Sequence, residues 1–362
     1  MARKLIIHIG NHKTGTSSIQ NTLFHNRDEL SRQGFTLFNQ NPNGSETKKG
    51  NASGWVKYQI NQKQVHRGRF KKGLPKAIST TGDNVIISAE GFSWIFDVLQ
   101  IEKFQKRLAK YFDDIKIIAY IRRQDIQAVS HHQQASKRSS AAGRWFYGGG
   151  SMALPCYKDY FQNYLNYHNR LGLWADCFGD SNLIIRIFEH NHLKNGDVVE
   201  DFFQVTGLKI STSSTRANQS KGFEKTKVGH LICQHNFSQS EWKILSRYLD
   251  NSGKLLPSRD EAISFYTNFR SSNELLNKRF LLSEKYSLFN EDFGQYPSEA
   301  GDQWNDVTAN AAINNLLKGV RDLPLFEKHD LEVMRHCARI LQKIDTDNSR
   351  KLVNIVKKYS AE

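Results

Sequence analysis

The chain has 362 residues, of which 51 are lysine or arginine and 36 are aspartate or glutamate, so its formal net charge is +15 at pH 7. This length suits one large domain or two ordinary ones, and the excess positive charge favours anionic partners: nucleic acid, phosphorylated cofactors, acidic glycans or acidic lipid headgroups. The four cysteines lie far apart and form no C-x-x-C pair, which argues against a zinc site and a dense disulfide scaffold.

The sequence shows no N-terminal signal peptide, and none of its apolar stretches approaches about 18 residues. We therefore expect a soluble, cytoplasmic protein without a transmembrane segment, for which peripheral contact with a membrane is still possible. The sequence does not specify the oligomeric state.

The first predicted unit is a strand, a loop and a helix. Residues 4–10 (KLIIHIG) are typical of a buried strand that ends in a glycine turn. Residues 16–32 place Ile19, Leu23 and Leu30 at loosely helical spacing, and Gly34 follows as a helix stop.

Further elements alternate along the chain. Three more strands are predicted at 84–90, 115–121 and 182–189, and helices at 98–112, 124–138, 157–174 and 196–208. Residues 47–82 contain nine basic residues and no acidic one, and are predicted to be a long, partly flexible insertion. Residues 143–155 are predicted to form a glycine-rich loop, and the chain is mainly helical after about residue 222.

Strands that alternate with helices predict an α/β fold, a P-loop-type three-layer sandwich in which helices cover both faces of a central parallel sheet. We expect residues 1–222 to form this core, with the basic insertion at about 41–83, and residues 223–362 to form a mainly helical C-terminal region packed on it. In such sheets ligands bind beyond the carboxyl ends of the strands. Residues 11–18, Glu90 and the Arg122–Arg123 pair occupy such ends.

The stretch HIGNHKTGTSSIQ (8–20) nearly matches the phosphate-binding pattern G-x-x-x-x-G-K-[ST]. A glycine turn into a helix leaves backbone N–H groups unpaired beside the positive end of the helix dipole. Lys13 adds a charge, and Thr14, Thr16, Ser17 and Ser18 add hydroxyl groups. This pattern favours a phosphate-like ligand over the alternative, a tight turn with hydroxyl capping.

The lysine of this loop is displaced. Thr16 stands where a triphosphate-binding loop has the lysine that reaches the β- and γ-phosphates, and Lys13 precedes Gly15 by two residues. No clear second metal-binding aspartate ends a strand. Hydrolysis of a nucleoside triphosphate and kinase chemistry are therefore disfavoured, and we expect no metal requirement.

The segment HKTGTSS resembles the 5′-phosphosulfate loop of sulfotransferases that use 3′-phosphoadenosine 5′-phosphosulfate (PAPS). The arginine-and-serine signature of that family is matched by Arg122 and by Ser130 eight residues later, and the wording Y-x-R-R-Q-D-x-x-x-x-S is similar to the bacterial, carbohydrate-type branch. The resemblance covers residues 4–20 and 84–135 and is looser over 188–208 and 217–223.

This resemblance implies PAPS as the donor and adenosine 3′,5′-bisphosphate as the product. The loop residues Lys13, Thr14, Gly15, Thr16, Ser17 and Ser18 would bind the 5′-phosphosulfate. Arg122 and Ser130 would hold the 3′-phosphate. Two family features are missing: Ser18 replaces the tryptophan that stacks on adenine in the small-molecule branch, and the late R-K-G-x-x-G motif has no match.

The segment ANQSKGF (217–223) offers Asn218, Ser220 and Lys221 as weak candidates for a closing loop, or alternatively an ordinary helix N-cap.

Transfer to a hydroxyl or amine also needs a base. The resemblance points to Glu90, in ISAEGFSW, because carbohydrate sulfotransferases often carry a glutamate near this place. The alternative is that Glu90 caps the next helix or pairs with a lysine. His12 is the second candidate, and His131 and His132 are further rivals, since imidazole titrates in the right range.

We therefore expect a sulfotransferase that acts on a carbohydrate. Residues 47–82 and 126–158 contain no acid, and if they flank the cleft they could receive an anionic, extended acceptor. The family resemblance favours a bacterial surface or extracellular glycan, and Trp55, Trp145, Phe146 and Tyr147 are candidates for stacking on sugar rings. The alternative is that these basic segments form an ordinary solvent-exposed surface with scattered aromatic residues. Rival functions are a P-loop kinase-like ATP enzyme and a non-catalytic protein that binds nucleic acid, a partner we do not expect.

Overall fold

The computed structural model describes residues 2–61, 64–137, 142–210, 222–234, 246–303, 305–322, 350 and 354. The chain falls into two compact units, each assembled from three segments. The first unit comprises Met1–Gln127, Tyr157–Asn218 and Phe265–Glu291, and the second comprises Ala128–Cys156, Gln219–Ser264 and Asp292–Glu362.

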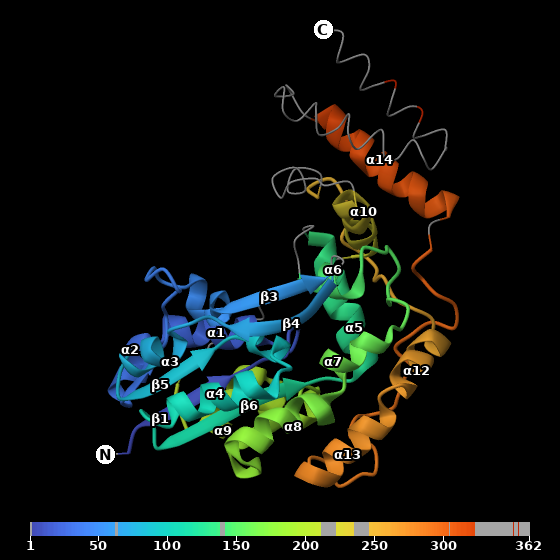
Figure 1. Cartoon of the computed structure of the whole chain (residues 1–362). Helices are drawn as coiled ribbons and strands as arrows, with labels where there is room; N and C mark the ends of the chain where they lie inside the picture. The colour runs from blue at the N-terminus through green and yellow to red at the C-terminus, as the bar shows by residue number, and fades with distance from the viewer. Residues whose placement is uncertain are drawn as a thin grey trace. The chain divides into compact units, whose positions relative to one another are not determined.

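A five-stranded sheet in the order β2-β5-β1-β6-β7 forms the centre of the first unit (Figure 1), and every neighbouring pair is parallel. Its strands are β1 (Lys4–His8), β2 (Phe35–Leu37), β5 (Asn84–Ser88), β6 (Asp114–Ile121) and β7 (Leu183–Ile187). The predicted parallel α/β fold is confirmed. Since all strands run the same way, the ends of β1, β5 and β6 meet at one edge of the sheet.

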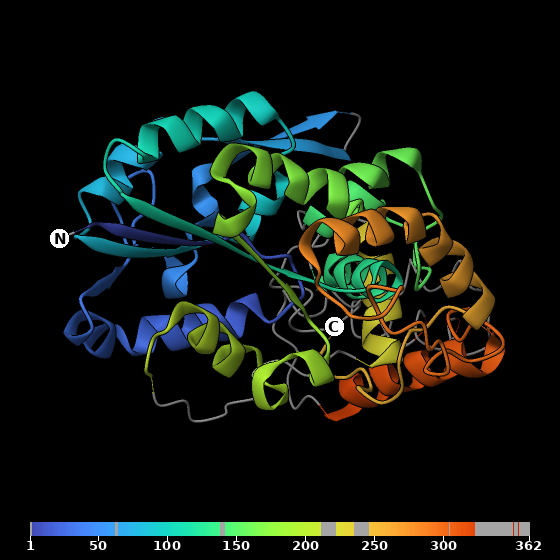
Figure 2. The same ribbon diagram turned by 90° about the horizontal axis from the view of Figure 1, so that it is seen from below.

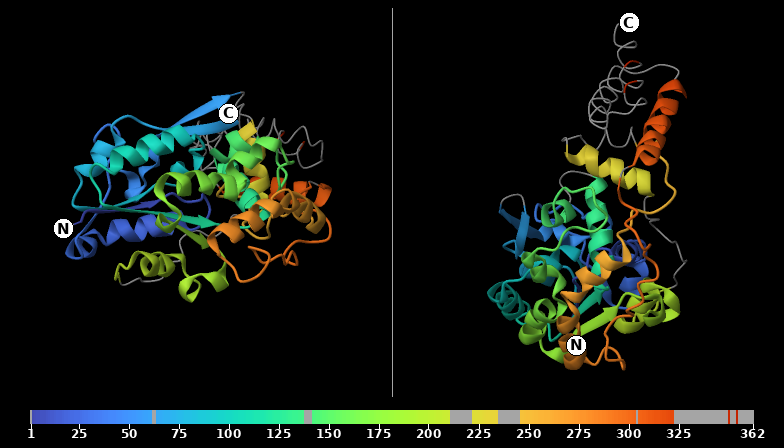
Figure 3. Two further views of the ribbon diagram at one scale, coloured as in Figure 1. Left: turned by 60° about the horizontal axis from the view of Figure 1, so that its bottom comes forward. Right: turned by 90° about the vertical axis from the view of Figure 1, so that its right-hand side faces the viewer.

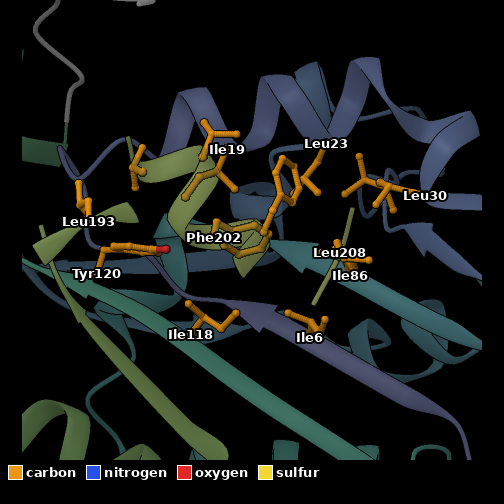
Figure 4. Packing of buried hydrophobic residues seen from close by; sticks show 14 residues of the cluster. Ile6, Ile19, Leu23, Leu30, Ile86, Ile118, Tyr120, Leu193, Phe202 and Leu208 are labelled. Atoms are coloured by element: carbon orange, nitrogen blue, oxygen red, sulfur yellow. The ribbon is translucent and has the colours of Figure 1, made fainter. Parts of the chain in front are cut away.

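One face of the sheet is covered by α1 (Thr16–His25), α2 (Arg27–Arg32) and α9 (Val198–Thr206). Figure 4 shows the apolar layer between them, in which Ile19 and Leu23 of α1 and Phe202 of α9 face Ile6 and Ile118 of the strands. The helix predicted over 16–32 is divided at Asn26, which ends α1 and precedes α2. The helix α9 ends at Gly207, as the sequence predicts.

The opposite face is covered by α4 (Val98–Leu108) and α8 (Tyr167–Phe178), as Figure 2 shows. Aromatic rings dominate this layer: Trp174 stacks on Phe178 at 5.8 Å between centroids. The helix predicted over 157–174 is interrupted, with α7 (Gln162–Leu165) before Asn166 and α8 after it, because the Asn166 side chain accepts a hydrogen bond from the Asn169 N–H and caps α8. The helix α13 (Arg270–Phe280) completes the unit.

The basic insertion contains secondary structure in the residues that the structure describes, and its predicted partial flexibility stays a prediction. It holds the antiparallel pair β3 (Val56–Asn61) and β4 (Gln64–Phe70), followed by α3 (Leu74–Ser79). The hairpin is the blue pair of arrows in the left panel of Figure 3. Phe70 anchors it by stacking on Phe104 of α4, with ring centroids 4.1 Å apart.

The second unit contains helices only, within the ranges the structure describes. They are α6 (Ala142–Tyr147), α10 (Phe223–Gln234), most of α12 (Arg259–Thr267) and α14 (Asp306–Asp322), together with the second half of α5 (Gln124–His132). The mainly helical C-terminal region is thus confirmed. The loop predicted over 143–155 is wrong at its start, where α6 forms.

Short 3-10 turns connect these elements: η1 (Lys48–Gly50), η2 (Ala52–Trp55), η3 (Glu90–Trp94), η4 (Gln133–Lys137), η5 (Asp159–Phe161), η6 (Asp180–Asn182), η7 (His190–His192) and η8 (Lys194–Gly196). Across the described ranges, no helix has both the length and the apolar character needed to cross a bilayer.

Candidate active site

The loop between β1 and α1 reverses direction through three left-handed residues. Gly10 has φ 89°, Lys13 has φ 64° and Gly15 has φ 77°. On either side of Gly10, the Ile9 and Asn11 N–H groups still donate to the carbonyls of Ile118 and Tyr120, each at 2.9 Å, so the loop starts as an extension of the sheet. Lys13 is the only one of the three that carries a Cβ, and residues with a Cβ rarely adopt this conformation.

The first turn of α1 has no side-chain cap. Gly15 occupies the N-cap position, where it makes no side-chain cap bond, and its carbonyl accepts from the Ser18 and Ile19 N–H groups at 2.9 and 3.1 Å. Thr14 is buried and its hydroxyl donates to the Asn11 carbonyl at 2.8 Å, so it braces the loop. Thr16 is buried, Ser18 is half-buried and Ser17 is exposed. This turn can therefore present backbone N–H groups and two hydroxyls to an anion.

Gly15 is also required by packing. A Cβ at this position would lie 2.5 Å from Cγ1 of Val198, the first residue of α9. The Val198 side chain therefore packs directly against the Gly15 backbone.

Arg122 lies beside this loop. Its Nη1 is 3.5 Å from the Lys13 carbonyl oxygen, and its guanidinium lies over the Phe188 ring at 5.7 Å from the centroid. The neighbouring Arg123 has a different role. It is buried, forms a bidentate pair with Asp125 at 2.8 and 3.0 Å, and donates to the Asn290 carbonyl at 2.5 Å.

Ser130, the predicted partner of Arg122, is half-buried on α5 and belongs to the second unit. Its proposed role toward a 3′-phosphate stays a prediction. The candidate closing-loop residues Asn218, Ser220 and Lys221 lie outside the described residues.

Glu90 begins η3, directly after β5, and both of its carboxylate oxygens accept hydrogen bonds from neutral amides. Gln20 Nε2 donates to Oε2 at 2.7 Å and Asn51 Nδ2 donates to Oε1 at 2.8 Å. Glu90 does not pair with a lysine: within the described chain it takes part in no ion pair within 4.0 Å. The N-cap of η3 is Ala89, so Glu90 does not cap it either.

A buried chain of polar groups lies behind Glu90. Gln20 Nε2 also donates to the Ser88 hydroxyl at 3.2 Å, and Ser88 is 2.8 Å from His8 Nδ1. Burial lowers the pKa of His8 to about 4, an effect that the charge of Glu90 partly opposes. His8 is therefore a neutral ring at pH 7 that orients Ser88, and through Ser88 it limits how Gln20 can turn.

His12, the second candidate base, is held by its neighbours. Its Nδ1 is 3.0 Å from the Tyr164 hydroxyl and 3.4 Å from the Ser93 hydroxyl. The ring keeps some exposed surface, yet enough protein surrounds it that desolvation lowers its pKa to about 4, against the opposing charge of Glu90. Arg170, which is fully buried, donates to Asn11 Oδ1 at 2.6 Å and to the Tyr164 carbonyl at 3.0 Å, so it supports both the loop and the His12 pocket.

The rival histidines of α5 do not reach solvent. His131 and His132 are both buried in the second unit, where His132 stacks on His230 at 4.6 Å between ring centroids and its pKa is lowered to about 4 by burial. Side chains enclosed in this way pack the interior of the unit and have no surface to offer an acceptor.

Most of the aromatic residues predicted to stack on sugars are core residues. Trp55, Phe146 and Tyr147 are buried, and Trp55 Nε1 donates to the Gln40 carbonyl at 2.6 Å. Trp145 alone of the four is half-exposed. The prediction is wrong for the three buried rings because aromatic side chains in a basic segment still serve to anchor that segment.

Gln20 and Asn51 are the residues of the candidate site that the sequence does not reveal. Gln20 stands on the buried side of α1, where a polar residue among apolar ones is a weak signal for a specific partner. Asn51 lies in the basic insertion, and nothing in the sequence relates it to Glu90, which is 39 residues away.

No family model matches the chain. An uncharacterised protein of Archaeoglobus fulgidus is 28% identical over 233 residues, which cover 59% of this chain and 60% of that protein. The chain thus spans about 60% of the length of the curated relative it matches. Among solved structures, a sulfotransferase from Alicyclobacillus acidocaldarius aligns with 67% of this chain and all of its own, at 13% identity and a TM-score of 0.34. A likeness this low carries no functional inference.

Proposed function

We propose that this protein transfers a sulfuryl group from PAPS to a hydroxyl or amine of a carbohydrate acceptor. The observation that carries the proposal is the loop itself: a left-handed Lys13, two residues before the glycine that starts an uncapped helix, lies against Arg122. The sequence resemblance to the 5′-phosphosulfate loop supports the choice of donor.

The residues present fit a phosphosulfate. The uncapped turn of α1 offers backbone donors and the hydroxyls of Thr16 and Ser18, while Lys13 and Arg122 supply two positive charges. Fixed donors of this kind favour an anion and the further negative charge that develops as a bond to it breaks. Lys13, Thr14, Gly15, Thr16, Ser17 and Ser18 would hold the 5′ end, and Arg122 with Ser130 the 3′-phosphate.

When bound, PAPS supplies an activated sulfuryl group. The acceptor oxygen would replace the bridging phosphate oxygen on sulfur, and the electron pair of the broken bond would leave on adenosine 3′,5′-bisphosphate. Glu90 accepts the proton that the acceptor hydroxyl loses. Lys13 and the first-turn amides stabilise the charge on the departing oxygen.

The amide contacts of Glu90 suit this role. Each carboxylate oxygen has two lone-pair sites, so donation from Gln20 and Asn51 leaves acceptor capacity on both oxygens. Two fixed donors also restrict the rotation of the carboxylate, which is what positions a base. His12 is the second candidate for the base, although its Nδ1 already faces the Tyr164 hydroxyl.

Donor binding by wild-type, Lys13→Ala and Arg122→Ala proteins tests the proposal. Titration calorimetry with adenosine 3′,5′-bisphosphate should show binding to the wild type and weaker binding to both variants, and ATP with Mg²⁺ should not compete. Labelled PAPS offered with a panel of desulfated glycans then identifies the acceptor. Tight ATP binding without binding of the bisphosphate would favour a kinase-like enzyme instead.

A further inference from the structure

The two faces of the β3–β4 hairpin differ in character. Because side chains directly opposite in an antiparallel pair share a face, the register places Lys57 with Arg69 and Gln59 with Arg67 on one side. On the other side Val56 is buried, and a Cβ on Gly68 would lie 3.2 Å from the Trp94 carbonyl oxygen. One face is therefore packed against η3, and the other carries the charges.

We call Lys57, Arg67 and Arg69 the basic strip. Lys57 and Arg67 are exposed and Arg69 is half-buried. Like charges directly opposite one another destabilise a sheet, so the Lys57–Arg69 pair costs the folded hairpin stability. Of the three, Arg67 has a distant acidic neighbour, Asp97, at 3.9 Å, whereas Arg69 Nε is buried without a hydrogen-bond partner among the described residues.

The packed face connects this strip to Glu90. Tyr58 is the strand neighbour of Lys57, and its hydroxyl would lie 3.0 Å from a Cβ on Gly91, the residue after Glu90. The Gly91 N–H in turn donates to the Ser53 hydroxyl at 2.9 Å, just before β3. The hairpin that carries the basic strip thus contacts, through its packed face, the residue that follows our proposed base.

We propose that the basic strip binds an extended anionic polysaccharide and that the acceptor is a chain of this class. The proposal rests on the sulfotransferase function proposed above. Arg67 and Arg69 stand on alternate residues of β4, about 7 Å apart, and Lys57 lies opposite Arg69 on β3. The strip therefore presents separate cations, which suit repeated anionic groups better than one compact phosphate. Single-stranded nucleic acid would need stacking rings beside the charges, and Tyr58 and Phe70 belong to the other face.

Fluorescence anisotropy with labelled heparin and labelled neutral dextran tests this, without donor and across a salt titration. The variant Lys57→Gln/Arg69→Gln should bind heparin about tenfold more weakly than the wild type. The matched control Lys103→Gln/Lys110→Gln removes the same charge from exposed positions on and after α4 and should keep wild-type affinity. Dextran should bind to none of them.

A urea unfolding midpoint for Lys57→Gln/Arg69→Gln at or above that of the wild type shows that weaker binding is not a folding defect. Equal heparin affinity in the wild type and this variant, or an equal loss in the control, would overturn the proposal. So would a single-stranded oligonucleotide that binds the wild type more tightly than heparin and loses affinity in the same variant. Binding of adenosine 3′,5′-bisphosphate is measured separately and tests the proposed donor. Its absence would overturn the sulfotransferase proposal, whereas the heparin titration would still show whether the basic strip binds a polysaccharide.

Discussion

Gly10 and Glu90 are in direct backbone contact: a Cβ on Gly10 would lie 3.0 Å from both Cα and Cβ of Glu90. The turn after β1 thereby fixes the position of the Glu90 backbone, from which the carboxylate side chain extends. Since Gly10 also has φ 89°, it is required twice, once for its conformation and once for the space it leaves.

Gly10→Ala should therefore displace Glu90 and lower kcat by up to about a hundredfold, since small misplacements of a catalytic group are that costly. Gly34→Ala is the matched control, because Gly34 has φ 78° and a Cβ there would meet Asn84 Nδ2 at 3.7 Å and nothing closer. Urea unfolding should show a loss of stability in both, larger in Gly10→Ala, with kcat reduced in Gly10→Ala alone. Equal kcat losses would attribute the effect to general strain.

Replacing Lys13 should separate stability from function. Lys13→Ala keeps the Cβ at φ 64°, whereas Lys13→Gly removes it and relieves a backbone cost of about 1–2 kcal/mol. We expect both variants to lose binding of adenosine 3′,5′-bisphosphate, and Lys13→Gly to be at least as stable as the wild type. Calorimetry and urea unfolding measure the two properties, and retained binding in both variants would exclude Lys13 from the donor site.

Glu90→Gln should reduce kcat by about 10²–10⁴-fold, the usual contribution of a general base. The new amide nitrogen would face a donor from Gln20 or Asn51, so one of these must turn. Asn51 resists turning because its Oδ1 accepts from the Ser53 N–H at 2.8 Å, and we expect a stability loss of about 1 kcal/mol. Binding of adenosine 3′,5′-bisphosphate should be unchanged. Full turnover in this variant would direct attention to His12.

Acidification should destabilise the protein through its buried histidines. The pKa of His8 is about 4 in the folded chain and 6.5 as its ordinary value, so the unfolded chain takes up the proton first as the pH falls. The stability is complete above pH 6.5 and is lost progressively toward pH 4, by a few kcal/mol for each such histidine. His12 and His132 act in the same direction.

Urea unfolding at a series of pH values between 4 and 6.5 measures how the free energy of unfolding depends on pH. His8→Gln should flatten the curve by the contribution of one proton. A free energy of unfolding that stays constant as the pH falls from 6.5 would contradict the assignment.

The sheet could be predicted because its strands are continuous apolar runs, as in Ile86 and Ile118 of the core. The strand β2 could not, since three residues carry no pattern. The β3–β4 hairpin was hidden because the residues of its packed face, Val56 and Phe70, stand among lysines and arginines, and composition there indicates solvent. The glycine-rich sequence likewise concealed α6.

The loop was visible in the sequence because its glycines and Lys13 are adjacent in the chain. The support of Glu90 was not, since Gln20 and Asn51 are 70 and 39 residues from it and only the folded sheet brings them together. Short-range motifs predict which ligand a loop favours. Hydrogen-bond partners that depend on tertiary packing leave no spacing to read.

The left-handed Lys13 gives this position an evolutionary signature. Glycine there would be tolerated by the backbone at no cost, so drift without selection on the donor would be expected to replace the lysine. On the function proposed above, a descendant with the same sheet and glycine at this position would be a folded protein that had lost its donor site. The single codon for residue 13 could therefore be used to sort active from inactive members among chains that share this fold.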